Sequence, residues 1–327
     1  MLHFVQFHVV PSNGHNLPHT QPFEMRSRTS LRMTTHPTDV LVSAEWVEDR
    51  LDEFQSADPS YRLVEVNNPT VTPDSSYTPY EEGHIPGAIF FDWEKDLSDT
   101  VTRDLLDRDS FEQLNANAGI SEESTIVIYG GGRVPNWFAL FAYWEYKYFG
   151  HEDIRVLDGG KPYWVENGFP LREETPTFDS VSYTARGPFE HLRAYRSDVK
   201  QAIASDLPLV DVRSPEEFSG ELIAPEGLQE TAQRDGHIPG AKNVPTTTVL
   251  DDDGTFKDKE ELQEIFASVD VTPDQSVITY CRVGERSAIE WFVLHELLGY
   301  ENVQNYDGSW TEWGNGIRAP IETDVVD

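Results

Sequence analysis

Short runs of β-branched and aliphatic residues alternate with longer amphipathic or apolar segments along most of the chain. The runs at 63–66 and 126–129 have the length and composition of strands that are buried on both faces of a parallel sheet. Apolar and aromatic residues recur at helical spacing over 137–149 and 287–298, and a shorter amphipathic segment covers 197–205. Strands that alternate with helices predict an α/β fold, with helices covering both faces of a mostly parallel sheet.

The pattern occurs twice. Four short segments of the first half recur in the second half, in the same order and at separations of 146 to 153 residues. They are LVEV at 63 with LVDV at 209, GHIPGA at 83 with GHIPGA at 236, IVIY at 126 with VITY at 277, and LDGG at 157 with YDGS at 306. The sequence therefore predicts a duplicated domain.

The duplication sets the predicted domain boundaries. We expect a first domain at 37–171, a linker at 172–196, where Pro and Gly interrupt a stretch without a clear period, and a second domain at 197–327. Residues 1–36 hold three arginines and one acidic residue, a net charge of +2 in a chain of net charge −33. We interpret them as a disordered or artefactual extension, with Met33 as the natural start. The five histidines of this stretch fit no defined metal site.

Acidic residues dominate the composition. The chain has 58 acidic and 25 basic residues, and only seven of the basic residues are lysines. Salt near 1 M shortens the Debye length to about 3 Å and screens such self-repulsion, so we interpret the charge as adaptation to a cytoplasm of high salt. A surface of this sign disfavours nucleic acid, and no apolar run is long enough to span a membrane. The single cysteine excludes an intramolecular disulfide and a multi-cysteine metal site, and it fits the reducing cytoplasm.

That cysteine lies where a fold of this kind places its chemistry. The repeat sets Gly130 opposite Cys281, each directly after a buried strand and before a helix, at the carboxyl end of the sheet. Loop N–H groups, the start of the helix and the guanidinium groups of Arg282 and Arg286 are expected to favour the Cys281 thiolate and to hold an anion. The first copy lacks a nucleophile, although it keeps Arg133, and is expected to pack against the second and close one wall of its cleft.

Other residues that invite a functional interpretation are better explained by structure. Both copies keep the histidine of GHIPGA, but only one keeps a cysteine, so we expect His84 and His237 to support the fold. Relative to the first copy, the second has an insertion at Ser219–Asp235, which is expected to shape the entrance. Four tryptophans are candidates for packing between the domains or within their cores: Trp46, Trp137, Trp310 and Trp313.

Taken together, these segments resemble the tandem-domain rhodaneses. The resemblance rests on CRVGER at 281–286, LVDVRSPEEF at 209–218, YDGSWTEW at 306–313 and the paired GHIPGA segments, and it covers roughly 38–322. The loop is similar to that of prokaryotic thiosulfate sulfurtransferases, which reads Cys-Arg-x-Gly-Glu-Arg-Ser. The resemblance implies two tandem rhodanese-like domains, of which the first is inactive and the second is catalytic. It also implies a cysteine persulfide intermediate and no metal or organic cofactor.

By this resemblance Cys281 is the cysteine that forms the persulfide, and Arg286 is the substrate-binding arginine. The loop residues that wrap the sulfur are then Arg282, Val283, Gly284 and Glu285. Vertebrate-type members carry a lysine in place of Val283, so we expect anion binding to rest on Arg286 and the loop amides. A carboxylate beside an anion is adverse, so the Glu285 side chain is expected to point to solvent.

The implied reaction moves sulfur in two steps. The Cys281 thiolate takes the outer sulfur of thiosulfate and sulfite leaves, and then cyanide or a thiol takes the sulfur from the persulfide. Three alternatives stay open. The first is a 3-mercaptopyruvate sulfurtransferase, although that branch usually lacks the arginine after the cysteine. The second is a phosphatase of this fold, although its loop has the spacing Cys-x5-Arg rather than the Cys-x4-Arg found here. The third is a persulfide carrier, which would deliver sulfur to a partner protein.

Overall fold

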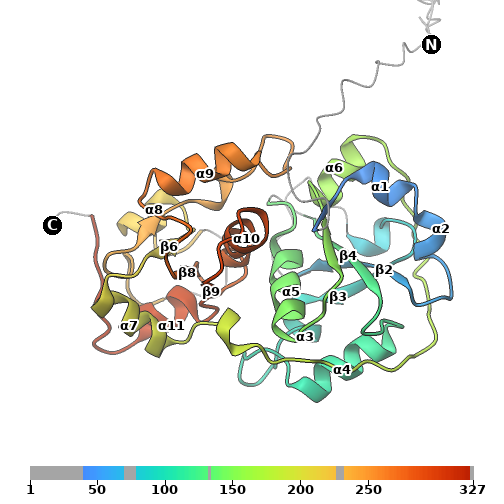
Figure 1. The fold of residues 1–327 in the computed structure, drawn as a ribbon, viewed down its shortest axis with the longest axis horizontal. Coiled ribbons are helices and arrows are strands. Elements are labelled where there is room, and N and C mark those ends of the chain that lie inside the picture. Colours follow the sequence, from blue (N-terminus) through green and yellow to red (C-terminus); the bar gives the residue numbers. More distant parts are fainter. Residues whose placement is uncertain (1–39, 70–78, 132–133, 226–231, 325–327) are drawn as a thin grey trace, which may run out of the picture. The chain divides into compact units, whose positions relative to one another are not determined.

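Two parallel β-sheets flanked by helices make up the protein (Figure 1). The structure is a computed structural model, and it describes residues 40–69, 79–131, 134–225 and 232–324. The first sheet has five strands in the order β1-β5-β4-β2-β3, and the second has four in the order β7-β6-β8-β9. Neighbouring strands in both sheets run parallel. The predicted α/β fold is therefore confirmed.

The strands match the predicted hydrophobic runs. The first sheet contains β1 (Leu41–Val42), β2 (Tyr61–Asn67), β3 (Ala88–Asp92), β4 (Thr125–Tyr129) and β5 (Ile154–Leu157). The second contains β6 (Leu209–Asp211), β7 (Lys242–Asn243), β8 (Val277–Tyr280) and β9 (Val303–Asn305). The runs at 63–66 and 126–129 lie within β2 and β4.

The helices of the first half are α1 (Ala44–Glu48), α2 (Leu51–Phe54), α3 (Trp93–Asp96), α4 (Arg108–Asn117), α5 (Trp137–Tyr148) and α6 (Gly160–Glu166). Those of the second are α7 (Arg196–Ser205), α8 (Pro215–Ser219), α9 (Lys259–Ala267), α10 (Ser287–Phe292) and α11 (Ser309–Asn315). The predicted helix at 287–298 is α10 continued by a π-helical segment, Val293–Leu297.

The two sheets are built alike. In the first, β5, β4, β2 and β3 are neighbours in that order, and in the second β9, β8, β6 and β7 follow the same order. The aligned segments of the sequence repeat thus occupy equivalent strands. The tyrosines that end β4 and β8 also act alike, because the Tyr129 and Tyr280 hydroxyls each accept the N–H of an isoleucine in the GHIPGA turn. The predicted duplication is confirmed at the level of topology.

Successive residues of each central strand face opposite layers, as the geometry of a strand requires. In β2, Val64 and Val66 join one buried cluster, while Leu63 joins another on the opposite face. In β8, Val277 belongs to the cluster shared with α10, and Tyr280 belongs to the cluster that contains tryptophans of α11. Burial on both faces explains why these strands read as continuous apolar runs.

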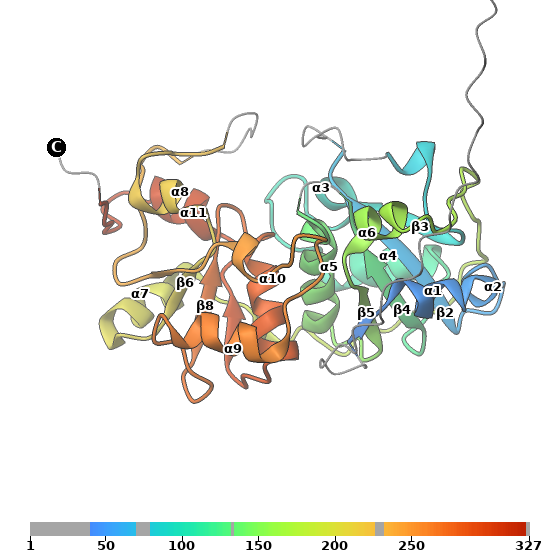
Figure 2. The same ribbon diagram turned by 90° about the horizontal axis from the view of Figure 1, so that it is seen from above.

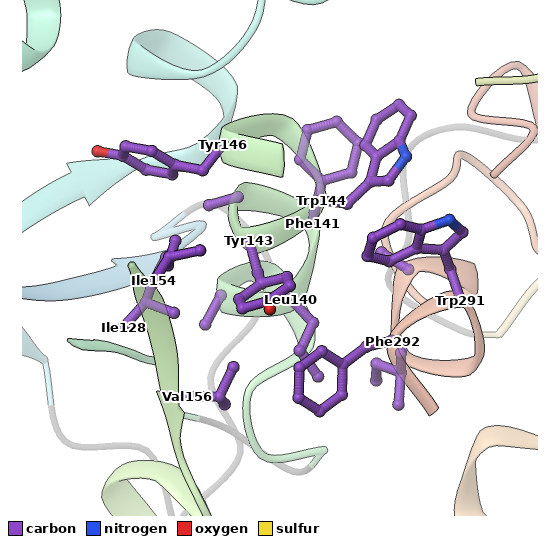
Figure 3. Close-up of a cluster of buried hydrophobic side chains, with 14 of the residues drawn as sticks. Ile128, Leu140, Phe141, Tyr143, Trp144, Tyr146, Ile154, Val156, Trp291 and Phe292 are labelled. Atoms are coloured by element: carbon purple, nitrogen blue, oxygen red, sulfur yellow. The ribbon is translucent and has the colours of Figure 1, made fainter. Parts of the chain in front are cut away.

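Helices α5 and α10 lie side by side and join the two halves (Figure 1, Figure 2). The Tyr143 and Phe292 rings meet edge to face at 4.9 Å between centroids, and Trp291 lies 6.5 Å from the same tyrosine. Figure 3 shows both aromatic residues of α10 directed at α5, and one buried cluster contains side chains of both halves. The prediction that the first copy packs against the second is confirmed.

The histidines of the GHIPGA turns have structural partners. The His84 ring nitrogens lie 2.9 Å from the Tyr80 carbonyl and 3.1 Å from the Glu174 carbonyl. In the second copy His237 stacks on Phe218 at 3.7 Å, and its Nδ1 lies 2.8 Å from the carbonyl of that phenylalanine. Both rings hold the turn against neighbouring backbone, which confirms the structural interpretation.

Several expected segments lie partly or wholly outside the described residues. The extension at 1–36 and Arg133 are among them, and so is the middle of the insertion, 226–231. The end of the insertion supports α11, because the Arg234 guanidinium donates to a backbone carbonyl in the last turn of that helix and to two carbonyls that follow it. Its expected role at the entrance stays a prediction. Within the described part of the chain, no helix is long and apolar enough to cross a membrane.

Candidate functional site

The loop between β8 and α10 holds Cys281 at the carboxyl end of a central strand. The backbone N–H of Cys281 donates to the Ser309 hydroxyl at 3.0 Å, and the Gly284 N–H donates to the Cys281 Sγ at 3.1 Å. Gly284 has φ +97°, and a Cβ there would lie 2.5 Å from the Asp307 Cα, so the turn requires glycine. The loop therefore curls its backbone around the sulfur, as anion-binding loops do.

Glu285 lies inside this loop, and the expectation that its side chain points to solvent is wrong. The residue is 3% exposed, and its Oε2 lies 3.7 Å from the Cys281 Sγ, within reach of the thiol proton. The tight turn at Gly284 carries the next side chain inward, toward the sulfur. The sequence gave no sign of this orientation, because the argument from charge alone favours the opposite one.

The groups around Cys281 act on the pKa of its thiol in opposite directions. Burial and then the Glu285 carboxylate raise the pKa of the Cys281 thiol. Arg286 and the backbone N–H groups of Ser287 and Val283 act in the opposite direction with smaller effect. The expectation that the loop favours the thiolate is therefore wrong for the state described here, because the arginines and amides do not outweigh burial and the carboxylate.

Arg286 is held by a carboxylate from another helix. Its two terminal nitrogens donate to the two carboxylate oxygens of Glu217 in α8, at 2.9 and 3.0 Å. Its guanidinium also lies 5.7 Å from the Trp137 ring of the first half. Although burial alone would raise the pKa of Glu217, Arg286 lowers it below its usual value. The predicted anion-binding arginine is thus present beside the loop but is neutralised by an ion pair.

The remaining loop residues are buried and tied by their backbone. Arg282 is 5% exposed, and its carbonyl accepts the Thr311 N–H at 2.9 Å. Val283 is 2% exposed, and its carbonyl accepts a hydrogen bond from the guanidinium of Arg103 in the first half. The structure thus brings all six predicted loop residues together, and Val283 contributes backbone rather than charge.

The equivalent loop of the first half has the same anchors without a nucleophile. The Gly130 carbonyl accepts the Lys161 N–H, as the Cys281 carbonyl accepts the N–H of Trp310. Below this loop the Lys161 ammonium lies 2.8 Å from the buried carboxylate of Glu65. The duplicated scaffold therefore survives in the first half, while the reactive group does not.

Residues of both halves line a small pocket beside the loop that holds Cys281. Val283 and Asp307 come from the second half. The first half supplies Trp93, Ser98, Arg103, Asp104, Leu105 and Phe141. The Asp307 carboxylate is in turn paired with the Arg193 guanidinium at 2.8 Å. Cys281 is not among the residues that line this pocket, so the expectation that the first copy forms one wall of the cleft stays a prediction. Of the four tryptophans, Trp310 and Trp313 lie instead in the core of the second half.

Sequence reasoning missed three contributors to the site, and two of them had a signal. Glu217 stands in the sequence SPEE, where Ser214 and Glu217 form a capping box that fixes the start of α8. Ser309 replaces the Gly160 of the first copy and can therefore bind the Cys281 N–H. Arg103 gave no signal, because its contact spans the two halves of the chain.

The site is thus a free, buried cysteine at the carboxyl end of a central parallel strand, enclosed by a loop whose backbone N–H contacts its sulfur. The rhodanese-like domain matches residues 43–167 and again residues 196–315. The chain belongs to the rhodanese family and contains two tandem copies of its domain.

Several curated relatives align over nearly their whole length. A protein of Haloferax volcanii named "Putative thiosulfate sulfurtransferase" is 58% identical over 87% of this chain and 96% of its own length. A protein of the same name from Mycolicibacterium smegmatis is 46% identical over 87% and 98%. The sulfur carrier protein TtuD of Thermus thermophilus is 45% identical over 88% and 97%.

Solved structures share the fold. The anaerobic ergothioneine biosynthesis enzyme from Chlorobium limicola, in complex with trimethyl histidine, has a TM-score of 0.75 and 26% identity, over 88% of this chain and 71% of that one. A variant of EanB with a cysteine persulfide, in a tetrahedral intermediate state with ergothioneine, gives the same scores and coverage. A cysteine persulfide is therefore seen in a structural relative.

Proposed function

We propose that this protein is a thiosulfate sulfurtransferase that carries sulfur as a persulfide on Cys281. The observation that carries the proposal is the loop around that cysteine, in which a backbone N–H already contacts the Sγ. The relatives named for thiosulfate sulfur transfer, which align over nearly their whole length, support the choice of donor. The arginine after the cysteine, Arg282, favours the small dianion over 3-mercaptopyruvate.

The proposed reaction has two steps. The Cys281 thiolate attacks the outer sulfur of thiosulfate, the S–S bond breaks, and sulfite leaves with the electron pair. Cyanide or a thiol then attacks the outer sulfur of the persulfide, and the Cys281 thiolate leaves. The amide of Gly284 and its neighbours would stabilise the charge on sulfur, while Arg286 and Arg282 attract the anion. No metal or organic cofactor takes part in this scheme.

The division of labour between the halves is part of the proposal. We assign 37–171 to the inactive domain, 172–196 to the linker and 197–327 to the catalytic domain, with 1–36 as an extension. We place the protein in the cytoplasm, because the persulfide chemistry needs its only cysteine reduced. Nucleic acid and membranes are not partners in this scheme.

A single-turnover experiment tests the proposal. The protein is incubated with thiosulfate in high salt, its intact mass is measured, and cyanide is then added while thiocyanate is assayed. We expect the mass of one sulfur atom to be gained and then lost as thiocyanate. Cys281→Ser and wild-type protein alkylated at its cysteine should gain nothing. No mass gain with the wild type contradicts the proposal, and a gain from 3-mercaptopyruvate alone moves it to that branch.

A carrier function is the second candidate, and the 45% identity to a sulfur carrier protein favours it. A carrier would form the persulfide from thiosulfate but release its sulfur slowly to cyanide and quickly to a partner protein. The same experiment separates the two, since mass gain without rapid thiocyanate formation indicates a carrier.

A further inference from the structure

The buried carboxylate beside the cysteine has no role in the reaction described so far. Glu285 is 3% exposed, and its Oε2 lies 3.7 Å from the Cys281 Sγ. A buried carboxylate is costly and is adverse in a site for an anion. Such a group is expected only where it interacts with something, and the partner that the geometry gives it is the sulfur itself.

The sulfur, for its part, needs a proton acceptor. Burial and Glu285 raise the pKa of the Cys281 thiol, so the resting cysteine holds its proton, and only the thiolate attacks sulfur.

Among the described residues, three other carboxyl groups lie near the loop. Glu290 of α10 is buried, and burial raises its pKa well above the usual value, so it keeps its own proton and cannot accept that of the thiol. The other two are occupied. Glu217 is bound by both terminal nitrogens of Arg286, and Asp307 is bound at two atoms by the guanidinium of Arg193.

We propose that Glu285 is a catalytic acid and base of this site, which accepts the proton of the Cys281 thiol before attack and gives it back after sulfur transfer. The inference rests on the proposed sulfur-transfer function. It adds to that function a specific residue for each proton, at a contact that already exists in the structure.

Charge balance supports the transfer. Cys281 and Glu285 share one proton and one negative charge, whether the proton is on sulfur or on oxygen, so its movement leaves the net charge of the buried pair unchanged. The charge moves from the carboxylate to the sulfur, where the Gly284 N–H already lies at 3.1 Å. The carboxylate also becomes neutral as the dianion approaches, which removes the repulsion from that group.

The surrounding charges are the same before and after the transfer. They are Arg282 in the loop, Arg286 with Glu217 of α8, Arg103 of the first half, and Asp307 with Arg193. The arginines near the loop stabilise the negative charge that forms on the sulfur. The carboxylate that takes the proton, that of Glu285, belongs to the loop itself.

The atoms balance over the cycle. Glu285 takes the thiol proton, the thiolate forms a bond to the outer sulfur of thiosulfate, and sulfite departs with the electrons of the broken S–S bond. Cyanide then bonds to the outer persulfide sulfur and leaves as thiocyanate. The Cys281 thiolate that is released takes the proton back from Glu285, so the cycle consumes no net proton and needs no oxidant or reductant.

The test combines two rates measured against pH in Glu285→Gln, Glu285→Asp and Glu301→Gln. The last variant removes the same charge at an exposed position outside the site. Alkylation by iodoacetamide reports the pKa of the thiol, and rapid-quench mass spectrometry with thiosulfate reports persulfide formation. Thermal unfolding of each variant checks that the fold is intact.

The proposal predicts that both rates of Glu285→Gln fall near pH 6. Alkylation becomes slower, because no neighbouring base takes the proton of the thiol and the reagent needs the thiolate. Persulfide formation near pH 6 falls by roughly 10²-fold and rises about tenfold per pH unit until the thiol itself ionises, as expected when general-base catalysis is lost. Glu285→Asp keeps an intermediate rate, and Glu301→Gln matches the wild type.

Other results overturn it. If Glu285 acts only through its charge, Glu285→Gln forms the persulfide as fast as the wild type or faster near pH 6, together with faster alkylation. Wild type that takes sulfur only from 3-mercaptopyruvate refutes the choice of donor, and the same pH comparison with that donor then decides the role of Glu285. Wild type that takes sulfur from neither donor overturns both proposals.

Discussion

Arg286 and Glu217 are buried together, and each depends on the other. The Glu217 side chain is 0% exposed and that of Arg286 is 10% exposed, and the two make a bidentate pair. Removing one member of such a pair leaves a buried charge without compensation, which costs far more than a surface ion pair contributes. This pair ties the end of the Cys281 loop to α8, so its integrity matters for the fold.

We expect Glu217→Gln to lower the free energy of unfolding at neutral pH by roughly 3 kcal/mol, because Arg286 loses its compensating charge. Since Arg286 lowers the pKa of Glu217 in the folded state, this contribution is present above the unfolded pKa of about 4.3 and is lost as the pH falls below it. Urea unfolding at several pH values measures both effects. Glu216→Gln, at an exposed neighbour in α8, should change stability by less than about 0.5 kcal/mol.

The sequence identified the residues of the loop but not the direction in which they point. Cys281 was found because it follows a buried strand opposite Gly130, which is a matter of local pattern and repetition. The inward position of Glu285 depends on the left-handed turn at Gly284, which is packed against Asp307. The pairing of Arg286 joins residues 69 positions apart. Contacts of this kind are set by tertiary structure, and a single sequence carries little information about them.

At the scale of elements, the carboxyl end of β5 in the first half contacts a segment of the second half through a buried aspartate. Asp158 directly follows β5 in the first half, and its Oδ1 accepts the N–H of Phe256 in the second half at 3.0 Å. Burial is the largest of the effects that raise the pKa of Asp158 to about 7. The aligned residue of the second half, Asp307, is instead paired with the Arg193 guanidinium. Equivalent aspartates of the repeat therefore have different surroundings, an arginine at Asp307 and burial near other carboxylates at Asp158.

Asp158 should make the protein less stable as the pH rises. The folded state keeps its proton up to about pH 7, whereas the unfolded chain releases it near pH 3.9, so stability falls by about 1.4 kcal/mol per pH unit between these values. Asp158→Asn keeps the acceptor for Phe256 and removes the titration. We expect this variant to be more stable than the wild type at pH 8 by up to about 4 kcal/mol and indistinguishable near pH 4. Equal pH slopes for the two proteins in urea unfolding would refute the assignment.

Elements were more predictable than contacts. Buried parallel strands are continuous apolar runs, so β2, β4, β6 and β8 could be read from composition and from the repeat. The apolar helix α5 was also predicted, and its low polarity on every side is explained by its position between the first sheet and α10. The π-helical continuation of α10 could not be predicted, because it depends on how that helix packs at its end.

At the scale of the whole molecule, net charge opposes the compact state. The chain carries 58 acidic and 25 basic residues. The ion pairs described above are largely buried around the site, whereas α9 presents acidic side chains to solvent, among them Glu260 and Glu264. These two residues lie one helical turn apart, where like charges repel. We therefore expect the stability of the fold to depend on screening by salt.

We expect the midpoint of thermal unfolding to rise steeply from about 0.1 M to about 1 M KCl and to level off beyond it, because the Debye length falls from about 10 Å to about 3 Å over that range. Sucrose, which strengthens burial without screening charge, should give a smaller rise. Glu264→Lys replaces a repulsive pair with Glu260 by an attractive one, so it should stabilise the protein by about 0.5 kcal/mol in low salt and much less in high salt. Gln263→Lys, which adds a positive charge without removing a negative one, serves as the matched control. If the midpoint is unchanged by KCl, or if Glu264→Lys has the same effect at every salt concentration, self-repulsion does not limit this fold and the acidic surface needs another explanation.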